Sequence, residues 1–227
     1  MEWYEHDHKE AHSNLLGRET PELSASDRLS LRLSRFFHVE FCHLAQSSEQ
    51  AVDVALKALF SPDLGERSAA FGDEIIVISA ENTFAEQWIT ARGGAPVDLR
   101  LSPNDFSVKV SMLEERLSLS TKAVWVEHGD GFLANPLVVR NFCNKYDLWM
   151  LEHVGRQKDV CYEIDGHAYQ IGTIGDWSIC DLTASQSCGA LLTRDKMLSS
   201  LLRVHMHAHG AVLSEKEAEA ILAEVFP

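Results

Sequence analysis

The feature that most limits the possible folds is a series of short apolar segments that alternate with helical segments between residues 74 and 152. Four of them are continuously apolar and have the length of strands, at residues 74–79, 95–101, 122–127 and 148–152. The segments between them, at 83–92, 105–117 and 136–146, have helical periodicity. Strands that are apolar on both faces lie inside a parallel sheet that helices cover on both sides. The alternation therefore predicts an α/β domain with a mostly parallel sheet.

The flanking segments extend this pattern. A short strand at residues 41–45 leads directly into Ser47-Ser-Glu-Gln50, a capping-box pattern that opens a helix. Residues 160–171 alternate around Asp165-Gly166, which predicts a β-hairpin. The remaining expected elements are a helix that begins near Ser24 or Ser26, strands at 177–182 and 189–193, and helices at 196–207 and 215–225.

The organisation that we expect is a polar arm over residues 1–22 followed by one domain over residues 23–227. A formal net charge of -14 argues against nucleic acid and anionic membranes as partners, because both require clustered basic side chains. No apolar run reaches the length of a membrane span, and the acidic N-terminus does not resemble a secretory signal. These features predict a cytoplasmic protein.

Cysteine usage agrees with this location. The five cysteines, Cys42, Cys143, Cys161, Cys180 and Cys188, are scattered and include no C-x-x-C pair. An odd and dispersed set is typical of reduced thiols in a cytosolic core. We therefore expect neither disulfides nor a zinc site.

The order of the elements carries a resemblance to a known family, together with the motifs Ser61-Pro-Asp-Leu-Gly-Glu-Arg67, Gly172-Thr-Ile-Gly-Asp176 and Gly189-Ala-Leu-Leu-Thr-Arg-Asp195. From about residue 30 to residue 210 the chain resembles the large domain of fold-type I pyridoxal phosphate (PLP) enzymes. More narrowly, it resembles the DegT/DnrJ/EryC1/StrS sugar aminotransferases, and in particular their CDP-4-keto-6-deoxyhexose 3-dehydratase branch. The resemblance implies a three-layer α/β fold with a mostly parallel sheet and a β-hairpin. It also implies that the small C-terminal domain of the family is absent.

The same resemblance implies where a cofactor would bind. The family holds the cofactor phosphate at a helix N-terminus with serine hydroxyls, and Ser47, Ser48 and Ser185 match those positions. Unpaired backbone N–H groups and the helix dipole favour an anion at such a terminus. The alternative is that Ser47 only caps the helix. An aromatic residue of the family covers the ring; ungapped matching places Asn82 there, and we expect the nearby Phe84 to be a core residue.

Two positions depart from the chemistry of the family. The aspartate that keeps the pyridine nitrogen protonated is replaced by His153, which follows Glu152. A neutral histidine cannot match a carboxylate in stabilising pyridinium, and the simpler alternative is a histidine at a sheet edge without a ligand. The Schiff-base lysine, which is histidine in the dehydratases, is replaced by Gln186. An amide neither forms an imine nor titrates near neutral pH, so PLP or pyridoxamine phosphate (PMP) could bind only noncovalently and no catalytic residue is assigned.

A histidine-rich segment stands where the dehydratases carry cysteines for an iron–sulfur centre. His205, His207 and His209 alternate along a predicted helix. Helical residues two positions apart point to different faces, so the three cannot converge on a metal there. We expect solvated or partly buried histidines and no metal site.

Three functions remain open at this point. The first is a degenerate, truncated family member without catalysis, which pairs in a homodimer or with an intact paralogue as a partner or regulatory subunit in deoxysugar biosynthesis. The second is an active PMP-dependent 3-dehydratase or aminotransferase subunit, with a base such as His128, His153 or a residue of a partner. The third is a binder of nucleotide sugars or other anions.

Overall fold

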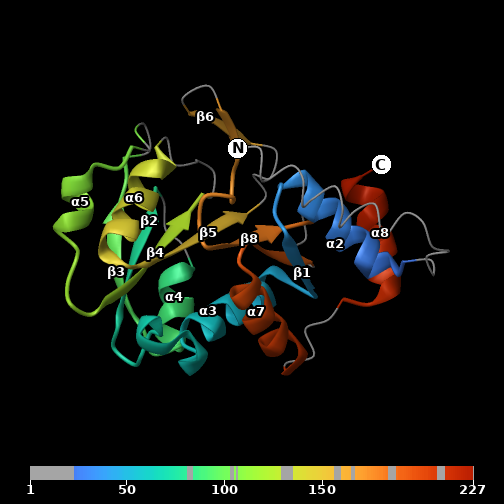
Figure 1. Ribbon diagram of the computed structural model, residues 1–227, viewed down its shortest axis with the longest axis horizontal. Coiled ribbons are helices and arrows are strands. Elements are labelled where there is room, and N and C mark those ends of the chain that lie inside the picture. Colours follow the sequence, from blue (N-terminus) through green and yellow to red (C-terminus); the bar gives the residue numbers. More distant parts are fainter. Residues whose placement is uncertain are drawn as a thin grey trace.

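A seven-stranded sheet forms the centre of the computed structural model, in the order β1–β9–β8–β5–β4–β2–β3 (Figure 1). The structure describes residues 23–80, 84–102, 105, 107–128, 135–155, 160–164, 167–183, 188–208 and 213–226. The strands are β1 (Phe41–Ala45), β2 (Glu74–Ser79), β3 (Ala95–Arg100), β4 (Thr121–Glu127), β5 (Trp149–Gly155), β8 (Trp177–Asp181) and β9 (Gly189–Thr193). Strands β3, β2, β4, β5 and β8 are parallel, and β9 is antiparallel to both of its neighbours. The predicted mostly parallel sheet is confirmed.

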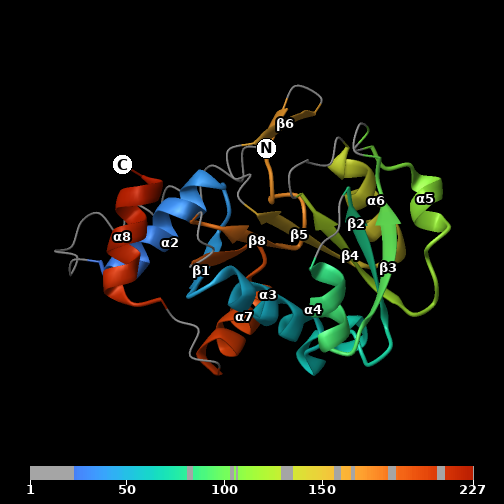
Figure 2. The same ribbon diagram turned by 180° about the vertical axis from the view of Figure 1, so that it is seen from behind.

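Helices cover both faces of the sheet (Figures 1 and 2). One layer contains α3 (Ser48–Leu59), α4 (Ala85–Ala91) and α7 (Lys196–Ala208), and the other contains α2 (Ala25–Phe36), α5 (Val110–Glu114), α6 (Pro136–Tyr146) and α8 (Glu215–Val225). Strand residues alternate between two apolar cores: in β2, Ile75 and Val77 pack with α3 and α4, while Ile76 and Ile78 pack on the other side. The predicted three-layer α/β arrangement follows from this alternation.

Helix starts follow the sequence signals closely. Ser24 accepts a hydrogen bond from the N–H of Asp27 and caps α2, and Ser47 accepts one from Gln50 at 3.1 Å and caps α3. The second half of the expected capping box does not form, because Gln50 Oε1 is buried without a hydrogen-bond partner among the described residues.

The segment before α5 is extended, contrary to the helix expected over 105–117. The Asn135 side chain bonds both the N–H and the carbonyl of Val108, at 2.9 and 2.8 Å. Asp105 accepts a hydrogen bond from the N–H of Ser107 at 3.0 Å. These side-chain bonds replace helical backbone bonds, so helix α5 begins only at Val110.

Phe84 is not a core residue, contrary to expectation. It is 65% exposed and precedes helix α4, whose buried residues Ala85 and Ile89 face the sheet. The helix is therefore two residues shorter at its start than predicted, and the Phe84 ring projects from its N-terminal end.

The β-hairpin formed by β6 (Cys161–Ile164) and β7 (His167–Gln170) lies outside the main sheet (Figure 1). Its pairing confirms the predicted hairpin, whereas the Asp165-Gly166 turn and the arm 1–22 lie outside the described residues. All five cysteines are free thiols, as expected, and burial raises the pKa of Cys143 and of Cys188 to about 12. Among the described residues, no helix is long and apolar enough to cross a membrane.

Candidate functional site at the carboxyl ends of the strands

Three charged side chains lie together where adjacent parallel strands end. Glu127 is the last residue of β4, His153 lies opposite it near the end of β5, and Asp181 is the last residue of β8. The residues two positions earlier, Trp125, Leu151 and Ile179, all belong to the core beneath α3 and α4, so the three charged side chains face that layer. The carboxyl ends of parallel strands are where open α/β sheets bind ligands.

His153 is held between the two carboxylates. Its Nδ1 lies 2.8 Å from Glu127 Oε1, and its Nε2 lies 3.7 Å from Asp181 Oδ1. The other oxygen of Glu127 accepts a hydrogen bond from the Trp125 indole N–H at 3.1 Å. The Trp88 ring packs edge-on against the imidazole, with a centroid separation of 5.9 Å. His153 therefore sits in an interior strand with a bonded partner, not at a sheet edge as the simpler expectation had it.

This environment fixes the charge of His153. Burial lowers its pKa, but the charges of Glu127 and Asp181 and the hydrogen bond to Glu127 outweigh burial, and together they raise the pKa to about 10. The imidazole is consequently protonated at neutral pH, and both of its nitrogens are hydrogen-bond donors. Nδ1 donates to Glu127, and 3.7 Å to Asp181 is longer than a hydrogen bond.

The N-terminus of α3 lies over the same layer and carries two of the predicted phosphate-binding serines. Ser47 is engaged as the helix cap, but the hydroxyl of Ser48 is buried and has no hydrogen-bond partner among the described residues. A Cβ added at Gly189 would lie 2.9 Å from the Ser47 carbonyl, so the start of α3 packs directly on the start of β9. A buried unpaired hydroxyl at a helix N-terminus is suited to an anion. The cofactor role of Ser47 and Ser48 stays a prediction.

Several predicted residues fall elsewhere. Ser185, Gln186 and Asn82 lie outside the described residues. His128, a suggested base, faces the opposite side of the sheet and is completely buried. Its Nε2 lies 3.0 Å from Glu152 Oε2, and its Nδ1 lies 3.3 Å from the Tyr162 hydroxyl. This position makes His128 part of the core and separates it from His153.

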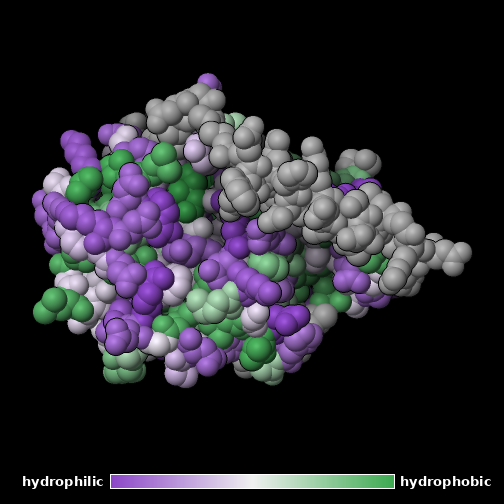
Figure 3. Space-filling model, in the orientation of Figure 1, coloured by the Kyte–Doolittle hydropathy of each residue, from purple (hydrophilic) through white to green (hydrophobic). Residues whose placement is uncertain are grey.

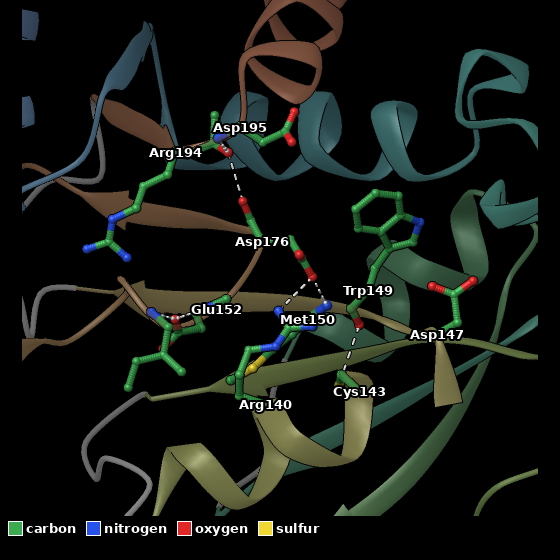
Figure 4. A network of polar contacts seen from close by, with 12 residues as sticks. Arg140, Cys143, Asp147, Trp149, Met150, Glu152, Asp176, Arg194 and Asp195 are labelled. Carbon is green, nitrogen blue, oxygen red and sulfur yellow. Dashed lines mark hydrogen bonds and ion pairs between the residues drawn. The ribbon is translucent and has the colours of Figure 1, made fainter. Parts of the chain in front are cut away.

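Glu152 also has a structural role. Its second carboxylate oxygen accepts hydrogen bonds from the backbone N–H groups of Ile174 and Gly175, at 2.9 and 2.5 Å (Figure 4). Burial raises the pKa of this carboxyl, but the His128 contact and the two backbone donors outweigh burial and leave the pKa below its usual value. Glu152 thus anchors the loop before β8 and faces away from His153.

Sequence reasoning missed Glu127, Asp181 and Ser79. Ser79 ends β2 beside Glu127, and its hydroxyl is buried without a hydrogen-bond partner among the described residues. The available signal was a polar residue at the end of each apolar strand, since parallel strands end at one edge of the sheet.

The histidines of α7 do not gather. His205 is partly buried, His207 is exposed, and His209 lies outside the described residues. In the described part of the chain, no group of three or more His, Cys, Asp or Glu side chains could hold a metal ion. The two described histidines agree with the expected solvated or partly buried positions.

A mostly parallel sheet in three layers, with polar groups at the carboxyl ends of its strands, occurs in many α/β proteins, and the fold-type I PLP transferases are among them. The sequence comparison is more specific: the model of the DegT/DnrJ/EryC1/StrS aminotransferase family matches residues 18–223, and the chain belongs to this family. The lipopolysaccharide biosynthesis protein RfbH of Salmonella typhimurium is 27% identical over 179 residues, which cover 78% of this chain and 41% of RfbH. This chain therefore matches less than half the length of that relative.

Solved structures agree with the fold. The Helicobacter pylori aminotransferase PseC, involved in the biosynthesis of pseudoaminic acid, superposes with a TM-score of 0.73 at 19% identity, over 95% of this chain and 61% of PseC. The E. coli GDP-4-keto-6-deoxy-D-mannose-3-dehydratase with bound hydrated PLP gives 0.66 at 18% identity, over 86% and 50% of the two chains.

PLP is the cofactor that this family implies, and the described residues fit its phosphate end but not its ring end. The hydroxyl of Ser48 at the start of α3, which has no hydrogen-bond partner in the part of the chain that the structure describes, fits a phosphate. The other end does not fit a protonated pyridine, because His153 offers an N–H donor on a charged ring instead of an accepting carboxylate. A cofactor bound there would lack the charged ring nitrogen that makes PLP an electron sink.

Proposed function

We propose that this chain is a family member without PLP catalysis, which acts as a partner or regulatory subunit in deoxysugar biosynthesis. The observation that carries the proposal is the imidazolium of His153, bonded to Glu127 and close to Asp181, at the position where the resemblance places a single aspartate. Gln186 at the position of the Schiff-base lysine supports it from the sequence, because an amide cannot move protons between carbon and solvent.

The partner that we propose is an intact paralogue with lysine or histidine in the Ala-Ser-x position, in a heterodimer; a homodimer is the alternative. Large apolar side chains on the surface support an association. Among the described residues, seven of them are exposed: Leu23, Phe71, Phe84, Val110, Leu119, Met197 and Val204. On the face drawn in Figure 3, apolar areas are interspersed among hydrophilic ones. Apolar surface of this kind is stabilised when a partner covers it.

The experiment combines the purified 227-residue chain with PLP or PMP, an amino donor and a nucleotide-linked 4-keto-6-deoxy sugar. We expect no product from the chain alone. We also expect co-elution with the paralogue when the two are co-expressed, and a change in the activity of the paralogue. The variant His153→Ala is the matched control, because turnover that survives this change comes from a contaminant. Turnover by the chain alone that His153→Ala abolishes would refute the proposal.

The unpartnered hydroxyl of Ser48 favours a second candidate, an active subunit with noncovalent PMP. This candidate requires both a bound-cofactor absorption band and turnover, and a flat spectrum at saturating PMP excludes it. The same hydroxyl suits a nucleotide-sugar or anion binder, which would show thermal stabilisation by nucleotide sugars without turnover.

A further inference from the structure

We propose that this chain binds a flat heterocyclic phosphate whose ring is uncharged. At the ring end of the site, the Glu127–His153–Asp181 cluster presents a hydrogen-bond donor where the resemblance places an acceptor. The nitrogen that such a ring turns toward His153 accepts a hydrogen bond from Nε2. This inference rests on the proposed loss of catalysis and names the ligand class that the remaining site takes.

The first step is the direction of the hydrogen bond. Glu127 occupies Nδ1 at 2.8 Å and is itself fixed by the Trp125 indole at 3.1 Å. His153 therefore keeps a fixed orientation, with Nε2 as its remaining donor. Nε2 is paired with the Asp181 charge at 3.7 Å, but it has no hydrogen-bond partner within the described residues. His153 is only 8% exposed, so a bound ring would meet this donor with little screening by water.

The second step is the charge of the ring. A pyridinium presents an N–H toward the protein, and two donors that face each other cannot share a hydrogen bond. An uncharged pyridine nitrogen presents a lone pair and satisfies Nε2. The site therefore favours a ligand whose ring nitrogen is unprotonated over one whose ring nitrogen is protonated.

The third step is the shape of the ligand. Phe84, Trp88 and His153 form a continuous series of rings, with centroid separations of 6.1 Å and 5.9 Å. Phe84, at the outer end, is 65% exposed, so this aromatic surface is open to solvent. Aromatic faces favour planar ligands, and the free hydroxyl of Ser48 at the start of α3 supplies an anion contact. A planar ring with a phosphate meets both features.

The test measures the dissociation constants of two probes by calorimetry at pH 9: pyridoxamine 5′-phosphate, whose ring nitrogen is mostly unprotonated at that pH, and its N-methylated analogue, whose ring is permanently cationic. Quenching of tryptophan fluorescence, compared with Trp88→Phe, locates binding beside His153. In the wild-type chain we expect the uncharged form to bind at least about tenfold more tightly than the cation.

The matched variant is His153→Asp combined with Glu127→Gln, which restores an acceptor and avoids three adjacent carboxylates. Because the added methyl group is the same in both proteins, the ratio of the two constants isolates the effect of charge. We expect the tenfold preference to disappear or reverse in this variant. If the variant does not fold, as judged by circular dichroism, His153→Gln, which removes the imidazolium charge, takes its place in the comparison.

Equal affinities for the two probes in the wild-type chain, or no binding of either, would overturn the inference. These failures differ from failure of the proposed function. Turnover by the chain with the expected ligand preference contradicts the loss of catalysis and leaves the inference standing. If the chain shows neither turnover nor the ligand preference, the proposed loss of catalysis stands and this inference is overturned.

Discussion

The two ends of the central strands use polar residues in opposite ways. At the amino ends of β5 and β8, the Asp176 carboxylate accepts hydrogen bonds from Arg140 at 2.9 Å and from the N–H of Met150 at 2.7 Å (Figure 4). Its backbone bonds Met150 and Thr193, at 2.7 and 2.8 Å. At the carboxyl ends, the hydroxyls of Ser48 and Ser79 and Nε2 of His153 are buried without hydrogen-bond partners among the described residues.

This difference separates stability from binding. The hydrogen bonds of Asp176 contribute to folding, whereas buried groups without partners cost stability until a ligand satisfies them. The amino ends also contain such groups, because Arg140 Nε and Trp177 Nε1 are buried without hydrogen-bond partners among the described residues. The Asp176 network at the amino ends is therefore part of the scaffold. The cluster at the carboxyl ends is instead suited to bind a ligand. Removing the Asp176 carboxylate should therefore lower the free energy of unfolding, whereas removing a hydroxyl without a partner among the described residues, such as that of Ser48, should not lower it.

The largest expected effect is at the amino end. Asp176→Ala should lower the free energy of unfolding by about 3 kcal/mol, because it leaves the partly buried Arg140 without its ion pair and Met150 N–H without its acceptor. Urea denaturation measures the change. Glu114→Ala is the control: it removes an exposed pair with Lys145 and should cost no more than about 1 kcal/mol. Equal losses in the two variants would contradict the scaffold role of Asp176.

An intermediate effect is expected from the charge of His153. Its folded-state pKa of about 10 exceeds the unfolded value of 6.5, so the folded chain binds the extra proton between these values. The stabilisation is complete below pH 6.5 and is lost as pH rises toward 10. Relative to His153→Gln, the wild-type chain should lose about 2 kcal/mol of unfolding free energy between pH 7.5 and 9. Parallel stability curves for the two proteins would show that His153 is neutral.

The smallest effects compare neighbouring serines at the start of α3. Ser47→Ala removes the helix cap and should lower the free energy of unfolding by about 1 kcal/mol. Ser48→Ala removes a buried hydroxyl that has no partner among the described residues and should leave stability unchanged or raise it by about 0.5 kcal/mol. Thermal denaturation of the two variants gives the comparison. A loss at Ser48 as large as that at Ser47 would mean that the Ser48 hydroxyl is satisfied in the folded chain.

The fold was largely predictable because its signals are local. Helix α6 (Pro136–Tyr146) and strand β9 (Gly189–Thr193) begin and end at the predicted residues. The start of helix α5 was not predictable, because the Asn135 side chain, 27 residues from Val108, holds the preceding segment extended. The exposure of Phe84 likewise depends on the direction from which α4 approaches the sheet.

The candidate site was predictable only in part. The sequence identified Ser47, Ser48 and His153 through the resemblance, but the charge of His153 depends on Glu127 and Asp181, which lie 26 and 28 positions away in the chain. Only strand order and register bring these side chains together. A histidine interpreted alone is neutral near pH 7, whereas one between two carboxylates is a cation. The sequence analysis treated His153 as a neutral histidine, whereas in the folded chain the two carboxylates favour its protonated form.

The most direct test of this account is a nitrogen-15 NMR titration of the His153 side chain in the 227-residue chain between pH 6 and pH 10. We predict that both ring nitrogens remain protonated at pH 8, with the transition centred near the pKa of about 10. A His153 that loses a proton near pH 6.5, with one nitrogen unprotonated at pH 8, would contradict the carboxylate-held cation on which the proposed function and its ligand preference depend.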